Sequence, residues 1–87
     1  MSGHQRDNVA PVPMTVFVKL FATFRVNRFP TRHMEFPVGS TVREALSALA
    51  IPEQEVAICM VNGHSKEIDH ILCDGDTLSL FPPVGGG

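Results

Sequence analysis

Apolar and polar residues alternate in the first part of the chain, a pattern typical of β-strands with one buried face. Over residues 14–22, the even-numbered positions are apolar and predict the inward face: Val16, Val18, Leu20 and Ala22. The odd-numbered positions predict the outward face: Phe17, Lys19 and Phe21. Alternation resumes over residues 32–36 and stops at Pro37 and Gly39, so we expect the two stretches to pair as an N-terminal hairpin.

A single helix is predicted after this hairpin. Thr41 and Glu44 have the spacing of a capping box, in which each side chain accepts a hydrogen bond from the other residue's backbone. An apolar stripe follows at helical spacing: Val42, Ala45, Leu46 and Leu49. We expect Pro52 to end the helix, because proline has no backbone N–H to donate.

Two more strands are predicted in the second half. Residues 56–61 are a short apolar run closed by an Asn-Gly turn at 62–63. Alternation directs three of its side chains inward (Ala57, Cys59 and Val61) and two outward (Ile58 and Met60). Residues 68–72 are predicted to form an irregular crossover, followed by a last strand over residues 77–81. The order strand–strand–helix–strand–strand predicts an α+β fold with one helix packed on one face of a sheet.

Composition narrows the class of protein. A chain of 87 residues with 44% hydrophobic residues fits one globular domain, and its net charge of −2 argues against a nucleic-acid binder. No apolar run approaches the roughly 20 residues of a membrane span. Two cysteines favour a reducing compartment, so we expect a cytoplasmic protein. We expect a flexible arm over residues 1–13, a domain over 14–83 and a flexible glycine tail over 84–87.

Charge is unevenly distributed along the chain. Residues 14–43 contain five lysines and arginines against one glutamate, whereas residues 44–87 contain one lysine against seven acidic residues. Scattered charges often form only a solvated surface. The alternative is that the acidic half steers the protein toward a basic partner surface.

No conventional catalytic motif is present, so we do not expect an independent enzyme. Two cysteines and two histidines could be gathered into a metal set, but their spacing matches no ordinary zinc module: Cys59, His64, His70 and Cys73. We therefore expect no metal site. Asp74 and Asp76 flank Gly75 just before the last strand, which predicts a turn rather than a catalytic carboxylate pair.

The C-terminal sequence carries the most specific signal. Residues 72–87, LCDGDTLSLFPPVGGG, resemble the ends of the ubiquitin-like sulfur carriers, namely the small subunit of molybdopterin synthase (MoaD) and its thiamine-pathway relative ThiS. Residues 18–22 (VKLFA) and 41–45 (TVREA) also fit, so the resemblance spans residues 14–87. Pro82-Pro83 favours the molybdopterin branch, whereas Gly85 departs from the Ser, Thr or Ala of many members.

This resemblance implies a β-grasp (ubiquitin-like) fold, with a mixed sheet of four to five strands and one main helix. It also implies that an ATP-dependent activating enzyme of the MoeB/ThiF type adenylates the carboxylate of Gly87. A sulfur donor would convert the adenylate to a thiocarboxylate, which passes sulfur to a partner such as the large (MoaE-type) subunit of molybdopterin synthase. The chain itself would bind no cofactor. Gly85 and Gly86 would let the tail enter a narrow channel.

Alternation also predicts a partner-binding patch on the outer sheet face, close to the tail. Its members are apolar and lie outside the predicted core: Phe17, Phe21, Met60 and Phe81. The chain leaving this patch adds Pro82, Pro83 and Val84. Covering of Phe17 and Phe21 by the arm or the first loop is the alternative.

Three other functions stay open at this point. A ubiquitin-like modifier would join Gly87 to lysines of other proteins, and a thiamine-type carrier would supply sulfur to a different product. A β-grasp interaction module with an inert tail would show no ATP-dependent chemistry at Gly87.

Overall fold

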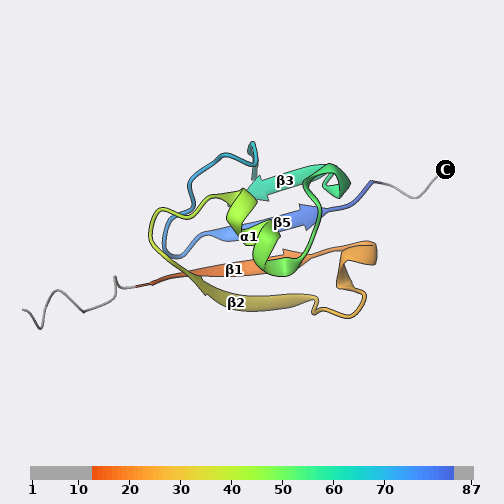
Figure 1. The fold of residues 1–87 in the computed structure, drawn as a ribbon, viewed down its shortest axis with the longest axis horizontal. Coiled ribbons are helices and arrows are strands. Elements are labelled where there is room, and N and C mark those ends of the chain that lie inside the picture. The colour runs from red at the N-terminus through yellow and green to blue at the C-terminus, as the bar shows by residue number, and fades with distance from the viewer. Residues whose placement is uncertain (1–12, 84–87) are drawn as a thin grey trace, which may run out of the picture.

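A computed structural model describes residues 13–83 of the chain, so the predicted arm over 1–13 (except Pro13) and the predicted tail over 84–87 lie outside the described residues. A five-stranded mixed sheet forms the centre of the domain (Figure 1). Its spatial order is β2-β1-β5-β3-β4. The strands are β1 (Met14–Leu20), β2 (Thr31–Phe36), β3 (Ile58–Val61), β4 (His64–Ser65) and β5 (Thr77–Phe81).

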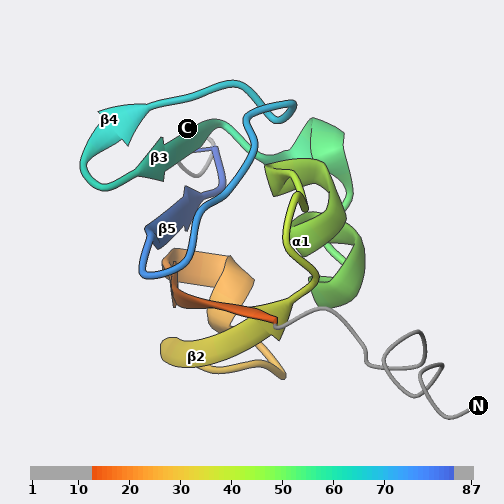
Figure 2. The same cartoon turned by 90° about the vertical axis from the view of Figure 1, so that its left-hand side faces the viewer.

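One α-helix, α1 (Val42–Leu49), packs against one face of this sheet, as Figure 2 shows. The capping box forms as predicted: the Glu44 N–H donates to Thr41 Oγ1 over 3.4 Å, and the Thr41 N–H donates to Glu44 Oε1 over 2.8 Å. The helix ends before Pro52, because Ala50 adopts a left-handed conformation with φ of 58°. No helix among residues 13–83 is long and apolar enough to cross a membrane.

Arg28, from the loop between β1 and β2, closes the far end of α1. Its guanidinium donates to the carbonyl oxygens of Leu49 and Ala50 over 3.0 and 3.1 Å, and to that of Phe24 over 3.1 Å. The carbonyls of Leu49 and Ala50 lack partners within α1, and a cation at a helix C-terminus is electrostatically favourable. A single arginine therefore ties the first loop to the helix.

The core lies between α1 and the sheet. It contains most of the predicted inward residues of β1 and β3, the apolar stripe of the helix and two leucines of β5, each at most 7% exposed: Val16, Val18, Leu20, Val42, Ala45, Leu46, Leu49, Cys59, Val61, Leu78 and Leu80. The predicted N-terminal hairpin is also confirmed, with β1 and β2 antiparallel and Val16 opposite Met34. The expected α+β fold of four to five strands and one helix is therefore correct.

Two predicted strands are shorter in the structure. β1 stops at Leu20 because Ala22, with φ of 53°, turns the chain into a short 3-10 helix, η2 (Ala22–Arg25). Ala22 is exposed, and Phe24 fills the core in its place. β3 begins only at Ile58, since the N–H of Ala57 donates to Phe81 out of register with the ladder; Ala57 is exposed rather than inward.

The pairing of β5 places the C-terminal end of the domain. β5 runs parallel to β1 and antiparallel to β3, so its last residue lies beside the end of β1 and the start of β3. A second 3-10 helix, η3 (Glu53–Glu55), precedes β3. In Figure 1 the chain consequently leaves the sheet at the C-terminal end of β5, on the side of the domain where η2 and η3 also lie.

Candidate functional site

The candidate site is the end of the sheet at which the central strand β5 stops. Pro82 is half-buried and Pro83 is exposed there. The four residues that the resemblance implies for the tail, Val84 and the three glycines Gly85, Gly86 and Gly87, lie outside the described residues. The surface from which they depart is therefore the part of the site that the structure defines.

Two stacked phenylalanines mark this edge. The rings of Phe21 and Phe81 are nearly parallel, at an interplanar angle of 12°, with centroids 4.2 Å apart. The Phe21 N–H donates to the carbonyl of Leu80, which fixes the end of β1 against β5. The Arg25 guanidinium lies 5.6 Å from the Phe21 ring centroid and donates to the Leu20 carbonyl over 2.7 Å. An aromatic pair with a cation beside it is thus held where the tail leaves.

Ile58 extends this pair across the sheet. It is opposite Phe81 in the β3–β5 ladder and is 47% exposed, which is unusual for a large apolar side chain. We call Phe21, Phe81 and Ile58 the tail-end row. Alternation in the sequence predicted that Ile58 points outward, but only the strand register shows that it neighbours Phe81.

The other two predicted patch residues lie on the same outer face but outside this row. Met60 is half-buried and opposite Ser79, one step further from the tail. Phe17 pairs with Thr77, four residues before Phe81, which is about 13 Å along the strand. Its ring centroid lies 4.6 Å from that of His33 of β2, with the two rings tilted by 38°. The patch is therefore not one cluster close to the tail, because Phe17 lies near the opposite end of the sheet.

The acidic half of the chain does not form one acidic surface. Five of its seven acidic side chains take part in local structure: Glu44, Glu53, Asp69, Asp74 and Asp76. Asp76, only 9% exposed, accepts from the Asn62 side chain and the Cys73 N–H, both over 2.8 Å. Asp74 accepts from the Thr15 N–H over 2.7 Å, so both aspartates are turn residues as predicted. Two of the seven are paired with Arg43 and one is buried, so four exposed acidic side chains without an ion pair are left among the described residues.

Glu53 and Asp69 belong to a network on the helix side. Arg43 of α1 donates to both carboxylates, and its bond to Glu53 is 2.8 Å long. The hydrogen bond to Glu53, and then that to Asp69, raise the pKa of Arg43, so its guanidinium remains charged. The network fastens α1 to η3 and to the crossover that precedes β5.

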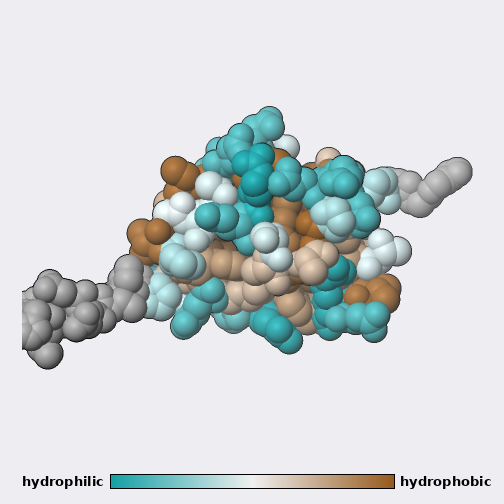
Figure 3. All heavy atoms as spheres, in the orientation of Figure 1, coloured by the Kyte–Doolittle hydropathy of each residue, from teal (hydrophilic) through white to brown (hydrophobic). Residues whose placement is uncertain are grey.

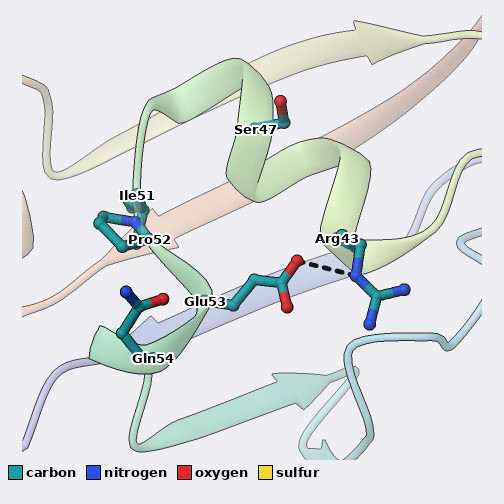
Figure 4. A pocket seen from close by; sticks show the side chains of 6 residues that line it. All are labelled: Arg43, Ser47, Ile51, Pro52, Glu53 and Gln54. Atoms are coloured by element: carbon teal, nitrogen blue, oxygen red, sulfur yellow. Dashed lines mark hydrogen bonds and ion pairs between the residues drawn. The ribbon is translucent and has the colours of Figure 1, made fainter.

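An open hollow of about 420 Å³ lies beside this network (Figure 4). Its lining comes from α1, η3 and the turn between them: Arg43, Ser47, Ile51, Pro52, Glu53 and Gln54. Arg43 and Glu53 neutralise each other across it. Figure 3 shows this helix-bearing side, where hydrophilic atoms cover much of the upper part and the most hydrophobic atoms form separate spots. The hollow therefore presents no unpaired charge for a ligand.

The cysteines and histidines do not come together as a metal site. Within residues 13–83, no group of three or more metal-ligating side chains is close enough to hold an ion. Cys59 is buried in β3, and this burial, with a smaller effect of Glu67, raises the pKa of its thiol. Cys73 is exposed in the turn before β5. Cys59 is thus a neutral core side chain.

The amino-acid sequence matches the family model described as "ThiS family" over residues 18–87. The chain belongs to the ThiS family. This confirms the resemblance given by the C-terminal sequence, and the match extends to the last glycine. No curated protein matches the sequence.

Solved structures show the same ubiquitin-like β-grasp fold in related proteins. Small archaeal modifier protein 1 from Haloferax volcanii is 30% identical, with a TM-score of 0.68 over 82% of this chain and 99% of that chain. A protein from Pyrococcus furiosus assigned as molybdopterin converting factor subunit 1 is also 30% identical, with a TM-score of 0.66 over the same shares. A complex of subunits 1 and 2 of molybdopterin-converting factor from Helicobacter pylori contains a chain 26% identical, with a TM-score of 0.57 over 85% and 100%.

Proposed function

We propose that this ThiS-family member is a sulfur carrier whose active group is the C-terminal carboxylate of Gly87. The family match that extends through Gly87 carries the proposal. The structure supports it in one respect: β5 delivers the chain end to a sheet edge with an exposed apolar row, where a partner enzyme could bind and receive the tail.

The chemistry follows from the low reactivity of a carboxylate. A Gly87 carboxylate oxygen attacks the α-phosphorus of ATP in the active site of a partner, and pyrophosphate leaves. A sulfur nucleophile at the oxidation level of sulfide then attacks the acyl carbon, and AMP leaves with the C–O bond electrons. The product is a C-terminal thiocarboxylate. Because glycine lacks a Cβ, Gly85, Gly86 and Gly87 suit a narrow channel leading to such an active site.

In this proposal the chain is a carrier, and its partners supply catalysis. The described residues include no cluster of a nucleophile, a base and an oxyanion-binding group near the end of β5. ATP is used by an activating enzyme of the MoeB/ThiF type, and the carrier itself needs no bound cofactor. A separate sulfur donor serves that enzyme.

We further propose that the sulfur goes to a molybdopterin-type product. Pro82-Pro83 favours that branch, and the H. pylori relative is a subunit in a complex with subunit 2 of molybdopterin-converting factor. A MoaE-type subunit is accordingly the expected acceptor partner. The tail-end row would be its docking site as well as that of the activating enzyme.

Protein modification is a second candidate. Its supporting observation is the 30% identity to small archaeal modifier protein 1. A modifier shares the adenylation step with a sulfur carrier, and the two functions diverge only when the activated acyl group reaches either sulfur or a lysine amine.

Mass spectrometry of the intact chain tests the proposal. The protein is incubated with the host's MoeB/ThiF-type adenylyltransferase, ATP and a sulfide source. The expected product is heavier than the free protein by the difference between sulfur and oxygen. Reactions without ATP, and a variant lacking Gly86 and Gly87, serve as controls. Absence of ATP-dependent change at Gly87 would refute the proposal, whereas adducts cleaved by isopeptidases would favour the modifier.

A further inference from the structure

We infer that the MoeB/ThiF-type activating enzyme that receives this chain presents a carboxylate to Lys19, beside an apolar recess that takes the tail-end row. The inference rests on the proposed function, because it concerns the surface to which the sulfur carrier docks. It identifies Lys19 as a residue that selects the partner.

Lys19 lies on the outer sheet face in β1, which is between β2 and the central strand β5. It lies in β1 two residues after Phe17 and two before Phe21, which directly follows the strand. In the neighbouring strands it is opposite Thr31 of β2 and Ser79 of β5. Further across the sheet, Ser79 is opposite Met60 of β3, which in turn is opposite Ser65 of β4. The positive charge is therefore surrounded by apolar and hydroxyl groups.

No carboxylate among residues 13–83 forms an ion pair with Lys19; both ion pairs of that region belong to Arg43. One acidic side chain shares the outer face, Glu35 of β2, which is opposite Thr15. Thr15 is four residues before Lys19, so this pair lies about 13 Å further along the sheet. Within the part of the chain that the structure describes, no carboxylate consequently pairs with the Lys19 ammonium group on this part of the face.

Docking costs desolvation free energy at Lys19 unless the partner supplies an opposite charge. Covering the tail-end row also removes water from Lys19, which lies in the next row. An ammonium group that loses water without gaining a partner is strongly destabilising, whereas an opposite charge with good geometry offsets the loss. A carboxylate on the partner supplies that charge, and it discriminates against surfaces that present a cation or only apolar groups.

Other charged side chains lie close to the tail-end row. Arg25, whose guanidinium lies over Phe21, places a second cation next to the row. On the acidic side, Glu53 is held by Arg43 and Asp76 is buried. The two cations Lys19 and Arg25 thus flank Phe21, whereas Glu67 lies on the β3 side, where it lines a hollow together with Ile58.

The test compares Lys19→Gln with Lys66→Gln. Lys66 is the other lysine of the chain; it is exposed after β4 and lines a hollow with Ile58, so it is a control for loss of one charge near the tail-end row but away from Lys19. Binding of each variant to the host's purified MoeB/ThiF-type adenylyltransferase is measured at low and high ionic strength. We expect Lys19→Gln to raise Kd about tenfold at low salt and to reduce the salt dependence, with Lys66→Gln within about twofold of the unchanged protein.

Carbodiimide coupling provides a second readout, because it joins an amine to a carboxylate only when the two are in contact. The expected product is an amide between Lys19 and an aspartate or glutamate of the adenylyltransferase, located by peptide mass spectrometry. Equal Kd values for both variants, or coupling at Lys66 instead of Lys19, would overturn the inference. These results leave thiocarboxylate formation by the unchanged protein intact, whereas failure of the proposed function abolishes that reaction itself.

Discussion

The substitution Phe81→Ala tests the tail-end row most directly. A half-buried phenylalanine exposes on the order of 50 Å² of its ring, and burying this area contributes about 1.3 kcal/mol at 25 cal/mol per Å². Lost contacts with the recess of the partner add to this, so we expect binding to the activating enzyme to weaken by about 2 kcal/mol. This corresponds to a roughly 30-fold increase in Kd.

Stopped-flow binding with the activating enzyme separates the two rate constants. We expect most of the change in faster dissociation, since the removed contact is short-ranged and uncharged. Loss of the 4.2 Å stack on Phe21 should also lower the stability of the free protein by about 0.5–1.5 kcal/mol, so thermal unfolding is measured in parallel.

Phe17→Ala is the matched control. It removes the same side chain from the same face, but about 13 Å from the end of β5. We expect its Kd to change less than about threefold. A folded Phe81→Ala variant with unchanged affinity would refute docking at the row, and recognition would then reside in residues 84–87. Equal losses for the two variants would show instead that the whole outer face binds the partner.

Three further predictions concern the core, the tail and the buried thiol. Leu46 is 1% exposed, so Leu46→Ala should lower the free energy of unfolding by about 2–5 kcal/mol in a denaturant titration; a loss below about 0.5 kcal/mol would contradict the packing. Deleting Gly86 and Gly87 should leave Tm unchanged, since the core residues within the described range 13–83 all precede Phe81, yet abolish thiocarboxylate formation. Burial raises the pKa of Cys59 in the folded protein, so the unfolded chain loses this proton first. Stability should therefore fall as the pH rises above about 8.5, and Cys59→Ala should show less of this decline in thermal unfolding at pH 7 to 10.

Most of the fold was predictable because local patterns determine it. Alternation along β1 and the capping box at Thr41 each involve residues close in sequence, and both are confirmed. The left-handed turns at Ala22 and Ala50 were not predictable in this way. Alanine carries no turn signal, and these conformations are imposed by packing, with Phe24 filling the core after the first turn.

The site was only partly predictable, because it depends on contacts between distant residues. Alternation alone directs Phe81 and Ile58 outward, but their pairing is a property of the register between β3 and β5. The same holds for charge: Asp74 binds the Thr15 N–H, 59 residues away in sequence. A count of acidic residues along the chain cannot distinguish such structural carboxylates from surface charge.

The two faces of the sheet have different roles, which would allow so small a domain to serve the partners proposed above. The inner face and α1 contain the core, and the network of Arg43 fastens the loops on that side. Side chains of the outer face can therefore change at little cost to folding, because most of them contact only their neighbours in the sheet. The end of β5 links the faces: Leu80 is fully buried while Phe81, the next residue, stacks on the outer surface. β5 thus holds the chain rigidly up to Pro82, beside the tail-end row. This limits the conformational entropy that would be lost when a partner binds.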